Sequence, residues 1–173
     1  NTNKFKSDIR LNTIKNEDSW YRFQGEHYWV CERDLNKLQF EYDGLFGFVV
    51  IDSLSQLQKY QSQIKKGIDV MTKELYDWNT IWDFQELQKR INDGVIFYCQ
   101  IVDDMAVHWQ FQWFNKVLIS DHKWNLEGVL PKDSTYGGHW WCHQEYRHIR
   151  NLIPSLFNNL AVHLKSIGMS RDL

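Results

Sequence analysis

Apolar positions follow a helical spacing along part of the chain. Between residues 54 and 78 they lie three or four positions apart and form one stripe: Leu54, Leu57, Tyr60, Ile64, Ile68, Met71, Leu75 and Trp78. This spacing predicts one long helix that buries one face, with a weak point at Gly67. Ser53, followed three residues later by Gln56, has the form of a capping box at the start of that helix.

Two further helices are predicted. The first has Thr80 as its N-cap and Asp83 at its third position, and its apolar stripe is Ile81, Phe84, Leu87 and Ile91. The second begins near residues 151–153, because Pro154 is tolerated only in the first turn of a helix. It ends at Gly168, a residue suited to the position that follows a helix.

Shorter runs rich in aromatic and β-branched residues predict strands at residues 27–31, 37–42, 45–51, 95–102, 105–114 and 136–143. Asp103 and Asp104 predict a tight turn that pairs residues 95–102 with 105–114. Alternation along the second of these predicts a shared face for Val107, Trp109, Phe111 and Trp113. Residues 115–135 are predicted to form a long connection.

This order of elements predicts the α/β class, with a mixed, mostly antiparallel sheet flanked by helices. We expect one domain over residues 20–173, in which residues 20–44 form a strand-rich N-terminal extension. Residues 1–19 are polar and have no period, so they are interpreted as an arm.

Charge and cysteine content exclude some classes of partner. Lysine and arginine number 20 and aspartate and glutamate 22, a formal net charge of −2, whereas nucleic-acid-binding domains are usually strongly basic. No apolar run approaches the roughly 20 residues that span a bilayer, and no signal-peptide pattern is visible. Three cysteines without a CxxC spacing fit a reducing compartment. We therefore expect a cytoplasmic protein with three free thiols and with neither nucleic-acid nor membrane partners.

The junction between the last strand and the last helix is the strongest candidate for chemistry. Residues 143–151 lead from that strand into the helix and carry Arg147, His148 and Arg150. A helix N-terminus presents free backbone N–H groups and a positive dipole end, and two guanidinium groups beside it suit a pyrophosphate.

At this junction the chain resembles the GCN5-related N-acetyltransferase (GNAT) superfamily. Residues 137–147 read GGHWWCHQEYR, residues 156–160 read LFNNL and residues 166–168 read SIG; the order of elements is similar over residues 45–168. The sequence departs from the family at Arg150 and Leu152, where glycines let the backbone approach the pyrophosphate. The family's fifth strand would begin near Leu173, so residues 27–42, a longer chain or a partner is expected to complete the sheet.

The resemblance implies an acyltransferase with acetyl-coenzyme A or another acyl-coenzyme A as donor substrate. A small-molecule or peptide amine would attack the thioester directly in a ternary complex, and the resemblance allows a homodimer. The implied coenzyme-binding residues are Trp141, Cys142, His143, Arg147, His148, Arg150 and Asn151.

Such a reaction needs a base for the amine proton and a donor for the leaving thiolate, roles suited to histidine and tyrosine. We expect them among His139, His108, Glu145 and Tyr136. No metal site is expected, because on a strand His139 and His143 share a face and Cys142 points away.

Two other interpretations stay open. Without the two glycines, the same fold would serve as a non-catalytic ligand-binding domain. Alternatively, a tryptophan-lined surface would bind a glycan or a nucleotide, with members drawn from Trp20, Trp29, Trp109, Trp113, Trp140 and Trp141.

Overall fold

The computed structural model describes the backbone of residues 20–23, 26–29, 33–37, 41–75, 83–120 and 125–172. The predicted arm, residues 1–19, lies outside the described residues. The elements are β1 (Trp20–Phe23), β2 (Glu26–Trp29), β3 (Arg33–Asp34), β4 (Phe48–Ile51), α1 (Leu54–Lys59), α2 (Gln61–Glu74), α3 (Phe84–Asn92), β5 (Ile96–Val102), β6 (Met105–Phe114), β7 (Lys116–Ser120), β8 (Asn125–Val129), β9 (Ser134–Cys142), α4 (Leu152–Ser166) and β10 (Arg171–Asp172). Short 3-10 helices, η2 (Leu45–Gly47) and η3 (Gln144–Tyr146), precede β4 and follow β9.

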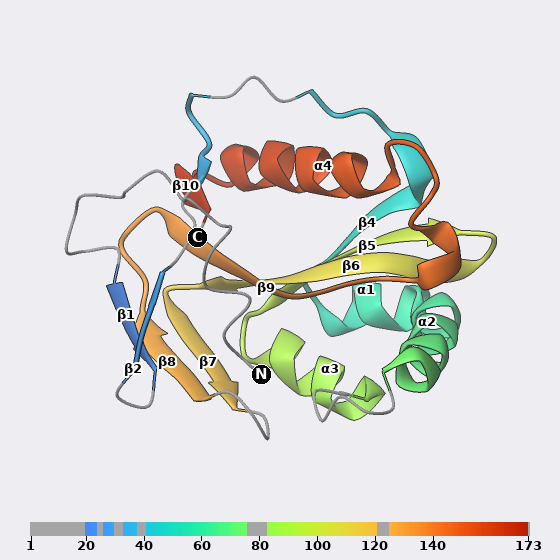
Figure 1. Ribbon diagram of the computed structural model, residues 1–173, viewed down its shortest axis with the longest axis horizontal. Helices are drawn as coiled ribbons and strands as arrows, with labels where there is room; N and C mark the ends of the chain where they lie inside the picture. Colours follow the sequence, from blue (N-terminus) through green and yellow to red (C-terminus); the bar gives the residue numbers. More distant parts are fainter. Residues whose placement is uncertain are drawn as a thin grey trace, which may run out of the picture.

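The central sheet has the strand order β3-β10-β9-β6-β5-β4, and every pair is antiparallel except β10 with β9 (Figure 1). The predicted α/β class with a mixed, mostly antiparallel sheet is confirmed. The predicted β5–β6 hairpin is also confirmed, and Asp103 and Asp104 both have positive φ, 50° and 58°, as a tight hairpin turn requires.

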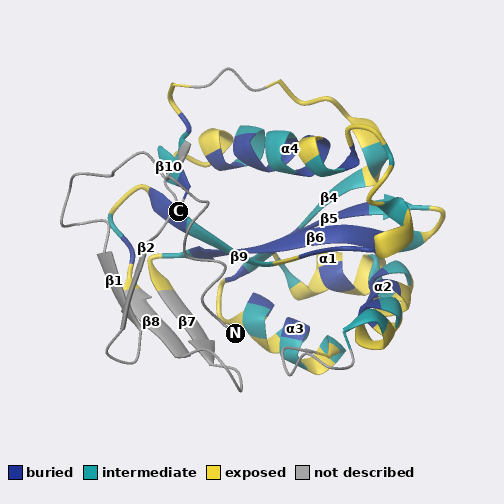
Figure 2. Ribbon diagram, in the orientation of Figure 1, coloured by how far each residue is buried: buried dark blue, intermediate teal, exposed yellow. Residues whose placement is uncertain are grey.

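Helices cover both faces of this sheet. α1, α2 and α3 lie on one face and α4 lies on the other, and the sides of the helices that face the sheet are buried (Figure 2). The larger core, between the sheet and α1–α3, includes Ile64, Leu87, Phe97, Trp109 and Phe111. A second core, beneath α4, includes Tyr98, Leu156, Leu160 and Leu164. The predicted packing of the helices through their apolar stripes is therefore confirmed.

The predicted long helix is in fact two helices. Tyr60 has φ −107° and ψ 14°, so α1 ends there and α2 begins at the next residue. Leu57 and Ile64 nevertheless both reach the core, because the break does not change which face is buried. Ser53 is the N-cap as predicted, and its hydroxyl accepts a hydrogen bond from the Gln56 N–H at 3.5 Å. The predicted end at residue 78 lies outside the described residues.

The prediction for the start of α3 is wrong, and the prediction for the limits of α4 is confirmed. Asp83, not Thr80, is the N-cap of α3, since its carboxylate accepts the Glu86 N–H at 2.8 Å. A carboxylate at this position satisfies a helix N–H and interacts favourably with the helix dipole. α4 begins and ends as predicted, with Pro154 in its first turn and Gly168, φ +89°, just beyond its end.

Two β-bulges change which residues share a face. β6 has an extra residue, Val107, between the pairs Gln100–His108 and Ile101–Ala106. Val107 therefore packs with Cys142 and Leu152 on the α4 side, and its predicted place beside Trp109 is wrong. In β9, His139 and Trp140 together lie opposite the single residue Gln110.

The strand predictions need three more corrections. Residues 115–135 hold the antiparallel pair β7–β8 rather than a plain connection. Of the predicted strand at residues 45–51, only β4 is a strand, because η2 takes up its first three residues. Residues 37, 41 and 42 of the predicted strand at 37–42 are not in a strand, and residues 38–40 lie outside the described part of the chain.

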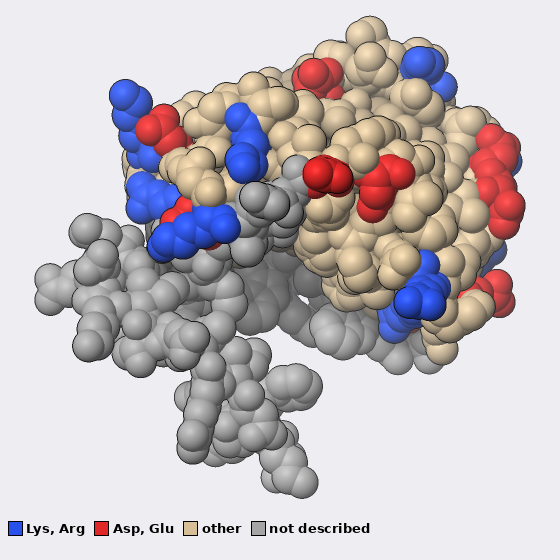
Figure 3. Space-filling model, turned by 90° about the horizontal axis from the view of Figure 1, so that it is seen from above, with Lys and Arg blue, Asp and Glu red and all other residues tan. Residues whose placement is uncertain are grey.

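None of the helices in the described part of the chain has both the length and the apolar character needed to cross a membrane. On the face that carries α4, lysine and arginine side chains lie in small groups with aspartate and glutamate among them (Figure 3).

Candidate functional site

β9 has one edge that is paired and one that is largely open. Its first edge pairs with β6 over most of its length. Its other edge pairs with β10 only at Ser134–Arg171 and Thr135–Asp172, where the two strands run parallel. Beyond Thr135 this outer edge has no strand partner among the described residues. An open strand edge presents unpaired N–H and C=O groups to which an extended ligand can add.

The bulge in β9 places two candidate residues on opposite faces. His139 has φ 51°, a conformation that costs a non-glycine residue energy, and its ring lies 6.0 Å from that of Phe111 and 5.7 Å from that of Trp113. Tyr136 packs against Trp113 on this α1–α3 side, and burial raises the pKa of its hydroxyl. Trp140 points to the α4 side and is 46% exposed.

His108 lies beneath Trp140. Its Nδ1 is 2.9 Å from Gln100 Oε1, and its Nε2 accepts the Trp140 indole N–H at 2.6 Å. The amide oxygen only accepts and the indole only donates, so Nδ1 carries the proton. Burial lowers the pKa of His108 to about 3, and the ring is neutral. While Trp140 holds its Nε2, His108 has no free lone pair for a substrate proton.

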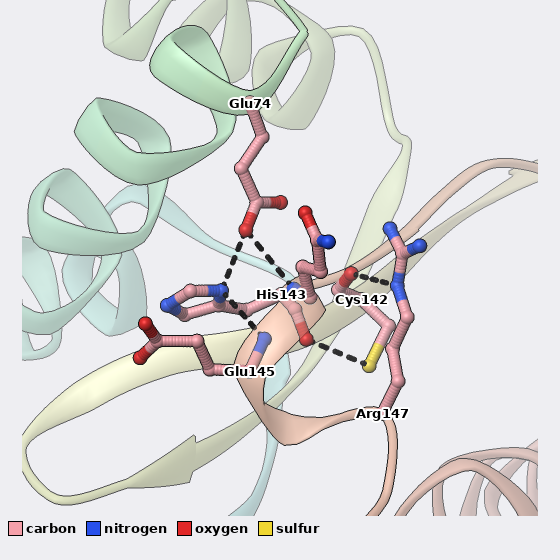
Figure 4. Close-up of polar contacts among 6 residues, drawn as sticks. Glu74, Cys142, His143, Glu145 and Arg147 are labelled. Carbon is pink, nitrogen blue, oxygen red and sulfur yellow. Dashed lines mark hydrogen bonds and ion pairs between the residues drawn. The ribbon is translucent and has the colours of Figure 1, made fainter.

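The end of β9 brings together Glu74, from the last turn of α2, and His143 (Figure 4). Glu74 Oε1 lies 2.7 Å from His143 Nδ1 and accepts the Gln144 N–H at 3.0 Å. The Glu145 N–H is 3.4 Å from the same ring nitrogen, a much weaker contact. A carboxylate thus occupies the start of the connection where the sequence predicts an anion.

Arg147 reaches back to the outer edge of β9. Its Nε donates to the Cys142 carbonyl oxygen at 2.9 Å (Figure 4). The His143 N–H is bonded to Val107 in β6, so by the alternation of a strand the Cys142 carbonyl faces the open side. The terminal nitrogens of Arg147 have no hydrogen-bond partner among the described residues.

The Cys142 thiol is not an activated nucleophile. Its side chain is buried against Val107 and Leu152, and burial raises its pKa to about 11 although Arg147 acts in the opposite direction. Few thiolate ions form near neutral pH at such a value, and the thiolate is the reactive species.

The remaining predicted coenzyme ligands surround the start of α4. His148, Arg150 and Asn151 are exposed, as is Glu145. Asn151 is the N-cap in a left-handed conformation, φ 68°, and its side chain makes no capping hydrogen bond. Several N–H groups of the connection are already bonded within it or to Glu74, namely those of residues 144, 146, 147, 149 and 152.

The structure thus brings Trp141, His143, Glu145 and Arg147 to one end of β9. His108 lies opposite Cys142 but is buried on the α4 side, and His139 lies further along β9 on the α1–α3 side. Trp141 stacks on His143, with ring centroids 5.9 Å apart and planes 17° apart. Glu74 and Gln100 were missed by the sequence analysis. Neither has a local signal, since each becomes notable only through a partner distant in the sequence.

No group of three or more His, Cys, Asp or Glu side chains in the described residues is arranged to hold a metal ion. Trp109, Trp113 and Trp141 are buried, so Trp140 alone of the four tryptophans in β6 and β9 offers an exposed ring. The side chains of Trp20 and Trp29 lie outside the described residues.

Comparison with known proteins gives no assignment: no family model, no curated protein and no solved structure matches this chain.

Proposed function

We propose that the protein is an acyltransferase of the GNAT type, which moves an acyl group from an acyl-coenzyme A to a small-molecule or peptide amine. One observation carries the proposal: β9 and β10 are parallel neighbours, joined by α4 and hydrogen-bonded only at their first residues. Among the described residues, the outer edge of β9 beyond Thr135 has no strand partner, and it ends at two arginines and a helix start. β10 also begins where the resemblance implies a fifth strand.

In this proposal the pantetheine arm adds to the outer edge of β9 near residues 140–143, as an extra strand would. Cys142 contributes its backbone there, so its buried thiol has no chemical role. Arg147 releases the Cys142 carbonyl to the arm and turns its guanidinium to the phosphates. Arg150 and His148 lie on the same exposed connection, and charge-assisted hydrogen bonds to phosphate oxygens are stronger than neutral ones.

Binding of coenzyme A tests this placement. Isothermal titration calorimetry of the parent protein with coenzyme A is expected to give saturable heat. The double variant Arg147→Ala, Arg150→Ala should weaken the affinity by about 3–6 kcal/mol, since each hydrogen bond to a charged group contributes about 1.5–3 kcal/mol. A matched control, Lys59→Ala with Lys73→Ala, removes two exposed cations from α1 and α2 and should leave the affinity unchanged.

Undiminished affinity in the arginine variant would show that this connection does not bind the phosphates. One observation favours a second candidate, a non-catalytic binding domain on the same fold: the Glu74 carboxylate already takes the first N–H of the connection, and Arg150 and Leu152 replace flexible glycines. That candidate is preferred if the parent protein gives no heat with coenzyme A or acetyl-coenzyme A.

A further inference from the structure

The imidazole of His143 is held in one tautomer. An ionised carboxylate only accepts hydrogen bonds, so the 2.7 Å contact with Glu74 Oε1 places the ring proton on Nδ1 and the lone pair on Nε2. Glu74 is itself fixed by the Gln144 N–H. Two hydrogen bonds to one oxygen therefore fix the position of the carboxylate, and the carboxylate fixes the tautomer of the ring.

Aromatic neighbours hold the plane of the ring. Trp141 stacks nearly parallel to it, and the Tyr146 ring lies 5.2 Å away. Tyr146 is anchored in turn, because its hydroxyl donates to Asp103 Oδ2 at 3.2 Å. His143 is 8% exposed, and its Nε2 has no hydrogen-bond partner among the described residues. The Nε2 lone pair of His143 is thus oriented and, among the described residues, unused, while Nδ1 has its hydrogen bond to Glu74.

We propose that His143 is the catalytic base of the transfer described above and that Glu74 is its positioning residue. This inference rests on the proposed function. An amine acceptor is an ammonium ion at neutral pH and must lose a proton before it can attack. Nε2 is the nitrogen that accepts this proton, and the Glu74 carboxylate stabilises the imidazolium ion that forms.

The step balances as follows. The amine nitrogen forms a bond to the thioester carbonyl carbon, the C–S bond breaks, and sulfur leaves with the electron pair as a thiolate. Two protons leave the nitrogen. The first passes from the ammonium ion to His143 Nε2 before the attack and is released to water. The second leaves as the amide forms and passes through Nε2 to the thiolate, so the products are an amide, a thiol and one proton. No oxidant or further reactant is needed.

The surrounding charges select the acceptor class. Glu74 faces the ring from α2, and Glu145 lies beside it from η3 (Figure 4). Arg147, which follows η3, is directed to the Cys142 carbonyl and not to the ring. Two carboxylates next to the base favour an acceptor that arrives as a primary ammonium cation over a neutral or anionic one.

The test compares steady-state kinetics of His143→Gln, Glu74→Gln and the parent protein, with acetyl-coenzyme A and a panel of primary amines, followed by thiol release. His143→Gln is expected to lower kcat about 100-fold or more, the usual contribution of a general base. Glu74→Gln keeps the shape and both acceptor contacts, and should lower kcat about 10-fold or more with little change in KM. Asp69→Asn removes one exposed carboxylate from the same helix and should change neither constant.

Nitrogen-15 spectra of the imidazole provide a readout that needs no turnover. The parent protein should show His143 with its proton on Nδ1, and Glu74→Gln, whose side chain also donates, should give a mixture of tautomers. If the parent protein is active and His143→Gln keeps the same kcat, His143 is not the base, while the proposed function still stands. A parent that binds no acetyl-coenzyme A and releases no thiol overturns the proposed function and this inference with it. A proton on Nε2 in the parent overturns the positioning role of Glu74.

Discussion

His108 is a titratable side chain within the fold whose two ring nitrogens are both occupied. Gln100 accepts from Nδ1, Trp140 donates to Nε2, and the ring is fully buried. The Gln100 amide nitrogen is buried without a hydrogen-bond partner among the described residues, a cost that the fold already carries at this site. The fold therefore keeps His108 neutral down to a pH at which an exposed histidine would be charged.

This burial predicts a pH dependence of stability. The pKa of His108 is 6.5 ordinarily and about 3 in the fold. Between these values the unfolded chain binds more protons, so the free energy of unfolding falls as the pH is lowered from about 6.5 toward about 3, by up to about 1.4 kcal/mol per pH unit. Burial lowers the pKa of His163 too, and acts in the same direction.

Urea unfolding at a series of pH values measures this dependence. In His108→Gln the slope of unfolding free energy against pH between 4 and 6 should become shallower, whatever the absolute stability of the variant. His163→Gln serves as the comparison and should remove only its own, separate part of the slope. An identical slope in His108→Gln and the parent would mean that His108 takes up a proton in the native state.

At the scale of elements, α2 and β6 make an unusually close backbone contact at Gly67. From the sequence, this glycine is expected to be a weak point of a helix. A Cβ atom there would lie 2.2 Å from the Ala106 carbonyl oxygen and 2.9 Å from the Trp109 ring. The glycine thus lets the helix approach the sheet, and this gain in packing offsets its poor helix propensity.

Gly67→Ala should therefore destabilise the protein even though alanine favours helix by about 1 kcal/mol. Overpacking of this kind typically costs about 1–3 kcal/mol, and after the gain in helix propensity we expect a net loss of up to about 2 kcal/mol, measured as a lower urea midpoint with an unchanged m-value. Ser62→Ala, at an exposed position of the same helix, is the control and should be neutral or slightly stabilising. A stabilised Gly67→Ala would contradict the close approach of α2 to β6.

At the scale of the whole molecule, the two layers of helices seal both faces of the central sheet. Cys99 belongs to the core on the α1–α3 side and Cys142 to the cluster on the α4 side, and both are free and fully buried. Burial raises their pKa values to about 12 and about 11. Reaction of either thiol therefore reports opening of the layer that covers it.

Thiol titration tests this arrangement. With Ellman's reagent at pH 8, the unreduced protein in denaturant should give three thiols, one for each cysteine in the sequence. Cys31 lies outside the described residues, so Cys31→Ser isolates the other two. This variant should show two thiols when denatured and none that react before unfolding when native. One thiol in the denatured, unreduced parent would indicate a disulfide, and fast native reaction of Cys31→Ser would contradict the sealed layers.

Features set by short-range geometry were predictable from the sequence. The β5–β6 hairpin follows from two apolar runs around Asp103 and Asp104, and the limits of α4 follow from Pro154 and Gly168. Much of the candidate site could also be predicted from the sequence, because Trp141, His143 and Arg147 are near neighbours in the chain. Each of these features depends on residues a few positions apart, whose steric and hydrogen-bonding preferences act locally.

The bulges at Val107 and His139 and the contact between Glu74 and His143 were decided only by the tertiary structure. Alternation along one strand does not reveal a bulge, because the extra residue is defined by the strand opposite. The partner of His143 lies on α2, and only the packing of that helix against the sheet brings its carboxylate to the end of β9. The sequence alone determined the limits of α4, the β5–β6 hairpin and the residues available for chemistry near the end of β9, whereas packing between layers determined which side chains meet.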